Sequence, residues 1–232
     1  MQRLLLISFS LVFACAAIPH ASAAAAQSLQ VVVRDPATDE FLARWKDERN
    51  GKLIGGIFWT MAHDSADEKQ LKEIELYVKA IQKLMSGDGT SFVQLGGVKT
   101  FKEKLAALLN HEDEPVRALA ATLLGVCGDA SYTDQIAMLL KPRKRTRDVP
   151  RYDRGRAAIA LGLVGARQYA PELVRLLKSP NPFDRSGAAF GLGAMRATEH
   201  RKAVAALLND PLEEVQNAAK ESLDMMSAAT NK

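Results

Sequence analysis

The second half of the sequence repeats itself, and this self-similarity constrains the fold more than any other feature. Four related strings begin at 105 (LAALLN), 136 (IAMLLK), 173 (LVRLLK) and 204 (VAALLN). The second leucine of each pair steps by 31, 37 and 31 residues: Leu109, Leu140, Leu177 and Leu208. A second column steps by 37, 31 and 31 residues: Arg117, Arg154, Arg185 and Gln216. Because the extra six residues fall at different steps in the two columns, an insertion lies between Leu140 and Arg154.

Each unit reads as a pair of helices. Thr100 with Glu103 has the spacing of a capping box at the start of the first helix, and Ser131 with Asp134 repeats it in the second unit. The partner helices are expected to start where a capping side chain stands close to a proline. These starts are Asp113 before Pro115, Asn181 before Pro182, and Asp210 before Pro211.

The partner helices carry small residues in matching positions. Alanine pairs stand at 120–121, 157–158 and 188–189. Each pair is followed by a leucine and then a glycine: Leu124 and Gly125, Leu161 and Gly162, Leu192 and Gly193. Alanine allows neighbouring helices to approach closely. The glycines suit either helix ends or tight crossings.

Paired leucines followed by D/N-P, then VR or DR, AA and LG resemble the HEAT-type repeat, in the short form found in bacterial HEAT-like proteins. The resemblance covers residues 100–226. It implies an all-α protein, a right-handed α-solenoid of about four helical hairpins that each contact mainly their neighbours. It also implies that Arg117, Arg154 and Arg185 pair with aspartates of their own or the adjacent unit, with Asp148 as a partner for Arg154. The alternative is that these arginines contact a ligand.

The fourth unit departs from the pattern. Lys220 stands where the other units have alanine, and Asp224 stands where they have glycine. A terminal repeat needs a polar outer face because nothing stacks on it. The repeats should therefore end near residue 226, and residues 227–232 form a tail.

Residues 24–99 show no convincing repeat. Ser65 with Glu68 predicts a helix to about Leu84 with one apolar stripe. Two shorter helices are expected upstream, around Trp45 and Trp59, and GDGTSFVQLGG at 87–97 reads as a loop. This region is expected to pack as a helical cap over the open first hairpin.

Residues 1–23 are typical of a cleaved secretory signal. Arg3 precedes an apolar run from Leu4 to Ile18, and small residues at 21–23 suit cleavage near Ala23. The run is shorter than the roughly 20 residues that a membrane-spanning helix needs, so no transmembrane span is expected. The predicted location is periplasmic or secreted. The alternative is a lipoprotein anchored at Cys15.

Cleavage near Ala23 would leave Cys127 as the one remaining cysteine of the sequence. Its simplest role is that of a small buried hydrophobic residue.

The insertion is strongly basic. KPRKRTRDVPRYDRGR at 141–156 carries a net charge of +6 in a chain of net charge +4. Pro142 and Pro150 prevent a continuous helix, so a protruding turn is expected. Six side chains are candidates for binding an anionic partner: Lys141, Arg143, Lys144, Arg145, Arg147 and Arg151. The alternative is a solvated loop without a binding role.

Residue patterns for catalysis or metal binding are scarce. His111-Glu112 is a single pair in a turn, too few ligands for a metal site. The sequence therefore favours a non-catalytic protein-interaction scaffold outside the cytosol, without a cofactor, that binds a protein or peptide on its solenoid face. The alternative is a HEAT-like enzyme or nucleic-acid-binding protein, of the bilin lyase or DNA glycosylase type. Those families are cytoplasmic, so the signal peptide counts against them and against nucleic acid as a partner.

Overall fold

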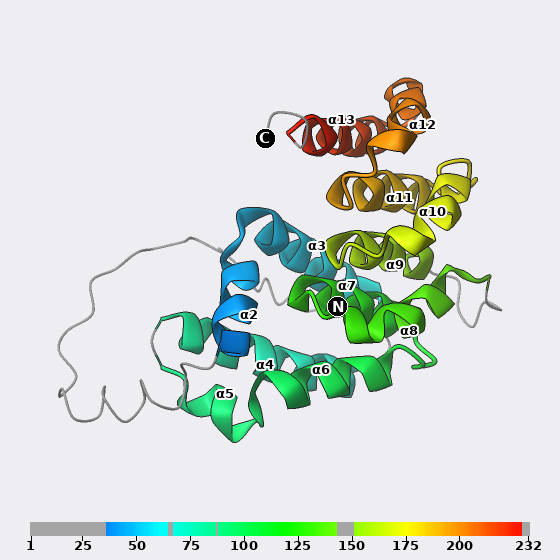
Figure 1. Cartoon of the computed structure of the whole chain (residues 1–232). Helices are drawn as coiled ribbons and strands as arrows, with labels where there is room; N and C mark the ends of the chain where they lie inside the picture. The colour runs from blue at the N-terminus through cyan, green and yellow to red at the C-terminus, as the bar shows by residue number, and fades with distance from the viewer. Residues whose placement is uncertain (1–35, 65–66, 87, 143–150, 229–232) are drawn as a thin grey trace.

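The computed structural model describes residues 36–64, 67–86, 88–142 and 151–228 (Figure 1). Within these ranges the chain is helical and contains no strand. The four repeat units have the bounds α6 (Gly97–Leu108) with α7 (Glu114–Cys127), α8 (Thr133–Ala137) with α9 (Asp153–Leu163), α10 (Ala170–Leu176) with α11 (Pro182–Ala194), and α12 (Arg201–Ala205) with α13 (Glu213–Ser227). Short 3₁₀ turns, Met138–Leu140 and Ala206–Asn209, continue α8 and α12.

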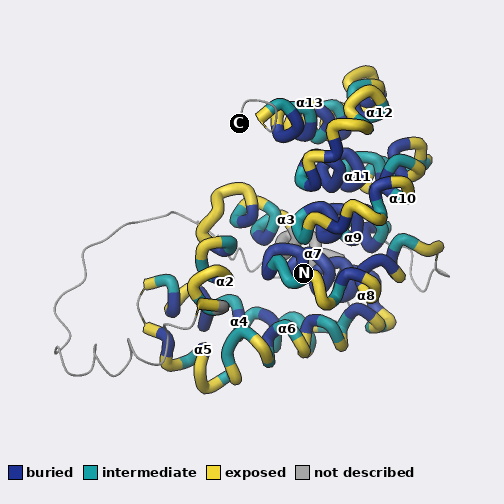
Figure 2. Tube along the Cα trace, in the orientation of Figure 1, coloured by how far each residue is buried: buried dark blue, intermediate teal, exposed yellow. Residues whose placement is uncertain are grey.

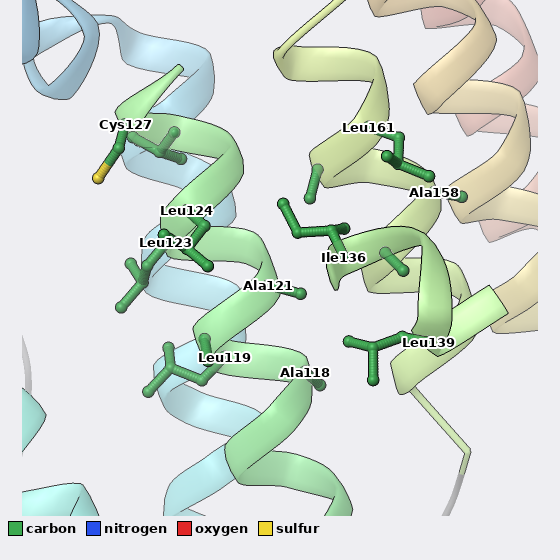
Figure 3. Packing of buried hydrophobic residues seen from close by; sticks show 14 of the residues in the cluster. Ala118, Leu119, Ala121, Leu123, Leu124, Cys127, Ile136, Leu139, Ala158 and Leu161 are labelled. Carbon is green, nitrogen blue, oxygen red and sulfur yellow. The ribbon is translucent and has the colours of Figure 1, made fainter. Parts of the chain in front are cut away.

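The units stack as an α-solenoid of two helical layers. The second helices of the units, α7, α9, α11 and α13, lie one above another, and α8, α10 and α12 lie along one side of that row (Figure 1). The row buries the small-residue faces predicted above, because every alanine in the pairs 120–121, 157–158 and 188–189 is fully buried. Figure 3 shows part of this packing, with Ala121 and Leu124 of α7 on the side that faces Ile136 of α8. The predicted all-α solenoid is confirmed.

The glycines that recur in the repeat units mark helix crossings. A Cβ atom built on Gly162 would lie 2.5 Å from the Cα atom of Gly191 in the next unit, and one on Gly125 would lie 2.5 Å from the Cα atom of Ala160. Gly193 meets Ser222 of α13 in the same way. Real Cβ atoms do not approach other atoms so closely, so the second helices touch backbone to backbone. Of the two roles left open for these glycines, the structure shows the tight crossing.

The N-terminal region contains α2 (Pro36–Lys46), α3 (Glu48–Asp64), α4 (Glu68–Met85) and α5 (Thr90–Gln94). The short helix α5 lies where the sequence predicted a loop, and its Phe92 is buried. Helices α2, α4, α5 and α6 share an aromatic cluster in which neighbouring ring centroids lie 5.1 to 6.3 Å apart: Phe41, Trp45, Tyr77, Phe92 and Phe101. Aromatic packing of this kind holds the region to the first unit. The Trp59 side chain lies outside the described part of the structure.

Helix α3 packs against α7 and reaches toward the last unit. Arg49 near its start forms an ion pair of 3.7 Å with Glu221 of α13. Leu53, one turn later, packs against a small cluster formed by Ile159, Phe190 and Met225 of three successive second helices. The N-terminal region therefore contacts both the first and the last repeat.

Several helices begin a few residues from their predicted starts. Asp67, not Ser65, caps α4, because its carboxylate accepts the Gln70 N–H at 3.0 Å. Helix α6 starts at Gly97, directly after Gly96 at φ 91°, so Thr100 falls inside its first turn. The two corrections have different causes, because a nearer carboxylate caps α4, whereas α6 follows the left-handed Gly96 and has no side-chain cap.

The repeats after α6 show similar shifts at two of their starts. Asp129, not Ser131, caps the turn before α8, because its carboxylate accepts the Ser131 N–H at 2.9 Å. Asp210 accepts the Leu212 N–H at 3.1 Å, so α13 starts at Glu213 and leaves Pro211 outside. The predicted starts at Asp113 and Asn181 are confirmed.

The polar residues of the fourth unit face solvent. Lys220 and Asp224 are exposed on α13. This helix ends the row of second helices, and exposed segments can be seen on it in Figure 2. Helix α7, in the middle of the molecule, is by contrast buried along its whole length. Exposure thus rises toward the end of the stack, as expected for a terminal repeat.

We predict that Gly162→Ala destabilises the stack, because the added methyl would push α9 away from α11. The expected loss in the free energy of unfolding is about 1–3 kcal/mol. Gly55→Ala in α3 is the matched control. A Cβ atom there meets nothing within 4 Å, so better helix propensity should stabilise the protein by up to about 1 kcal/mol. Chemical denaturation of both variants tests this, and equal effects would contradict the crossing.

Candidate functional site

The structure fixes the two ends of the basic insertion. Lys141 is exposed directly after the 3₁₀ turn that follows α8. Arg151 is partly buried, and its carbonyl oxygen accepts a hydrogen bond of 2.7 Å from the Asn181 side-chain amide in the next unit. Arg143, Lys144, Arg145 and Arg147 lie outside the described residues, so their predicted exposure stays a prediction, as does the turn between Pro142 and Pro150.

A buried glutamate, Glu114, holds the foot of the insertion, which is the segment 151–153 where the chain rejoins the stack at α9. The Tyr152 N–H donates to Glu114 Oε1 at 2.8 Å, which joins the start of α9 to the start of α7. Asp153 is buried beside this contact. Its carboxylate forms an ion pair with the Arg117 guanidinium, with 3.3 Å between Oδ2 and the Arg117 nitrogen. Burial, followed by the charge of Asp153, raises the pKa of Glu114. Two buried carboxyl groups therefore lie side by side where the inserted segment rejoins the stack, and Arg117 pairs with one of them, Asp153.

The arginine column forms a ladder that links successive units. Arg117 pairs with Asp153, Arg154 pairs with Asp184, and Arg185 pairs with Asp210. Each arginine thus reaches the aspartate at the start of the next second helix. The last pair is bidentate, with distances of 2.7 and 2.8 Å, and the hydrogen bond from Arg185 lowers the pKa of Asp210.

The same column also closes turns within its own units. Arg117 donates to the carbonyl oxygens of His111 and Glu112, and Arg185 donates to those of Ser179 and Pro180. Gln216 keeps part of this role by donating to the Asp210 carbonyl oxygen at 2.7 Å. Because these side chains are occupied by internal partners, the predicted structural ladder is confirmed. Asp148, the partner proposed for Arg154, lies outside the described residues, and Asp184 takes that role.

A shallow pocket opens on the second-helix layer beside the foot of the insertion. It has a volume of about 150 Å³ and lies between α9 and α11. Its described lining residues are Tyr152, Gly155, Arg156, Ile159, Phe183, Ser186, Gly187, Phe190 and Ala218. Sequence reasoning missed this pocket, because Arg156 was counted only as one charge of the basic run. An aromatic residue at each helix start, Tyr152 and Phe183, is the signal that could have indicated it.

Cys127 and His111 have structural roles. Cys127 is buried at the end of α7, and burial raises its pKa to about 12, as expected for a thiol that acts as a small hydrophobe. His111 Nε2 lies 3.2 Å from an Asp67 carboxylate oxygen, and Nδ1 accepts the Asp113 N–H. Over the described ranges, no group of three or more His, Cys, Asp or Glu side chains could hold a metal ion.

Comparison with known proteins supports the repeat assignment. Residues 139–224 match the family model for HEAT repeats, which confirms the HEAT-like units in that span. The solved structure of the complex of CpcE and CpcF of phycocyanin lyase from Nostoc sp. PCC7120 is similar, with 19% sequence identity and a TM-score of 0.49. The similarity covers 74% of this chain and 64% of that chain. No curated protein matches the sequence.

Within the described ranges, no helix has both the length and the apolar character needed to span a membrane.

We predict that Arg185→Ala lowers the melting temperature, because it leaves the buried Asp210 carboxylate without its partner. The expected loss is about 2–5 kcal/mol in the free energy of unfolding. Arg175→Ala is the control, since Arg175 is 71% exposed and pairs only with Glu172 on its own helix. An unchanged melting curve for Arg185→Ala would mean that the ladder does not stabilise the stack.

We also predict that Glu114→Gln becomes more stabilising as pH rises. A raised pKa means that the folded state holds the proton of the Glu114 carboxyl group more tightly than the unfolded chain does. In the unfolded chain, glutamate has a pKa of about 4.3. The stability that Glu114 gains from protonation is therefore complete below that value and is lost as pH rises through the folded pKa. Glutamine keeps the acceptor for Tyr152 and carries no charge. The gap in melting temperature between variant and parent should widen from pH 4 to pH 8, with Glu103→Gln, at an exposed position of α6, as the control for charge loss.

Proposed function

We propose that this chain is a non-catalytic protein-interaction scaffold that works outside the cytosol and uses its basic insertion to contact an anionic partner. The proposal rests on the continuous layer of stacked second helices, to which the insertion is anchored where it rejoins the stack at α9. Lys141 and Arg151 bracket the inserted charges, and the Glu114 and Asn181 contacts hold the foot to two different units. A rigid stack with one charged turn suits binding of a macromolecule.

The anionic partner is proposed from charge alone. The other turns between paired helices, NHEDEP, SPNP and NDPLEE, are short and acidic or neutral, so positive charge is concentrated on one turn. Concentrated charge attracts a partner of opposite sign over about one Debye length, roughly 8–10 Å at ordinary ionic strength. An acidic protein face fits this better than nucleic acid does, because the proposed location outside the cytosol keeps the protein from nucleic acid.

The compartment is tested separately from binding. Residues 1–23, which lie outside the described residues, carry the signal-peptide prediction. Fusion of residues 1–30 to a reporter that is active only after export should give activity, and a change of Leu5 and Leu6 to Arg should abolish it. Retention of the fusion in the cytosol would favour the alternative, a HEAT-like enzyme or nucleic-acid-binding protein of the lyase or DNA glycosylase type. Accumulation of the uncleaved fusion when the signal peptidase for lipoproteins is inhibited would instead indicate the Cys15 anchor.

We predict that replacing Arg143, Lys144, Arg145 and Arg147 with Ser weakens capture of the partner while the melting temperature stays unchanged. Immobilised protein lacking residues 1–23 would be incubated with an extract of the compartment, and bound proteins compared at low and moderate salt. The loss should be largest at low salt, because surface charge is screened as ionic strength rises.

The matched control removes the same charge elsewhere. Lys69, Lys72, Lys79 and Lys83 are all exposed on α4, far along the chain from the insertion. Their replacement with Ser changes the net charge equally and should leave capture unchanged. Equal losses in the two variants would indicate a general charge effect, and no loss in either would assign the insertion no binding role.

A further inference from the structure

The pocket beside the insertion has a floor made of backbone. Gly155 of α9 and Gly187 of α11 meet there, because a Cβ atom on Gly187 would overlap the Gly155 carbonyl oxygen. Tyr152 and Phe183 form one wall, with ring centroids 4.7 Å apart in an edge-to-face arrangement. Phe183 is 42% exposed at the mouth, so part of its apolar ring is available to a partner. The close helix approach that stabilises the stack thus also creates a small apolar depression.

Arg156 lies in this depression without a partner. Arg117, Arg154 and Arg185 each pair with an aspartate, but the Arg156 guanidinium makes no hydrogen bond or ion pair with any described residue. None of the described lining residues is acidic. Burial lowers the pKa of Arg156, and the nearby Tyr152 only partly offsets this effect. An unpaired, partly desolvated cation is unfavourable in the free protein, and an arriving anion would relieve that cost.

The size of the pocket narrows the class of ligand. Its volume of about 150 Å³ is below the roughly 300–1,000 Å³ of pockets that hold small molecules or cofactors. Such a depression suits one or two neighbouring side chains of a partner protein. Arginine and aromatic residues that flank a small pocket are the typical composition of a binding hot spot. A polyanion such as nucleic acid would call for several cations, and among the described lining residues Arg156 is the only one.

We propose that this pocket binds a protein segment in which an aspartate or glutamate stands beside an apolar residue, with the carboxylate on Arg156 and the apolar side chain against the wall formed by Tyr152 and Phe183. The inference rests on the proposed scaffold function and names the chemistry of its partner. It also places the contact on the second-helix layer, next to the basic insertion and on the same unit.

The test starts from short random peptides displayed on phage, selected on the full chain lacking residues 1–23. Selected peptides should share an acidic residue next to an apolar one. A synthetic peptide of the selected sequence should bind Arg156→Gln at least about tenfold more weakly, the loss typical of a hot-spot residue. Phe183→Ala should weaken binding of the same peptide. Arg175→Gln, which removes one arginine charge from exposed α10, should bind as the parent does.

A thermal melt separates binding from a structural role. Because Arg156 has no partner to lose, Arg156→Gln should melt at or above the temperature of the parent protein. A clearly lower melting temperature would make Arg156 a structural residue and overturn the proposal. Selection of peptides without acidic residues, or the same peptides on Arg156→Gln, would also overturn it. So would binding of a short single-stranded oligonucleotide, lost in Arg156→Gln, without any enrichment of acidic peptides.

Failure of this proposal can be told apart from failure of the scaffold function. If Arg156→Gln still captures the partner in the extract experiment as the parent does, the scaffold function stands and the pocket has no part in it. If acidic peptides are selected but the extract yields no partner, the pocket binds as proposed, and the scaffold function in that compartment is contradicted.

Discussion

Contact of backbone with backbone between successive second helices determines the rest of this structure. At Gly162 and Gly191 two helices approach so closely that neither position has room for a methyl group. Helices packed at this distance align their starts at the same edge of the stack. The arginine ladder, the foot of the insertion and the Arg156 pocket all lie along that edge, and each depends on the spacing set by the glycines.

Close packing also brings charges together that would otherwise stay in water. Asp153 and Asp184 are buried because the helix starts that carry them abut the preceding unit. Each is stabilised by an arginine from that unit, and Glu114 and Asn181 satisfy the neighbouring backbone and side-chain groups. The Arg156 guanidinium differs, because the glycines beside it leave a depression in place of a carboxylate. Buried charge is paired almost everywhere along this edge, which is why one cation without a partner indicates a place for a ligand.

The repetition in the sequence predicted the helical stack, its order and its buried faces, because a periodic pattern repeated over four units leaves few alternative folds. The ladder could also be anticipated from Arg117, Arg154 and Arg185, although its aspartates came from the adjacent unit's helix starts. Helix starts were less predictable, because Asp67 and Asp129 competed locally with Ser65 and Ser131 for the same N–H groups. The pocket could not be found in this way, since it depends on the distance between Gly155 and Gly187, residues far apart in the sequence that only the packed stack brings together.

Helix α3 changes the mechanical character of the molecule. In an open solenoid each repeat touches only its neighbours, so the ends can unwind one unit at a time and the whole behaves like a spring. Here Arg49 pairs with Glu221 and Leu53 packs beside Met225, so the last repeat is tied to the N-terminal region across most of the chain. Stretching or twisting the stack must break these long-range contacts as well as local ones. The N-terminal region therefore adds contacts to the last repeat beyond those that the repeat makes with its neighbour.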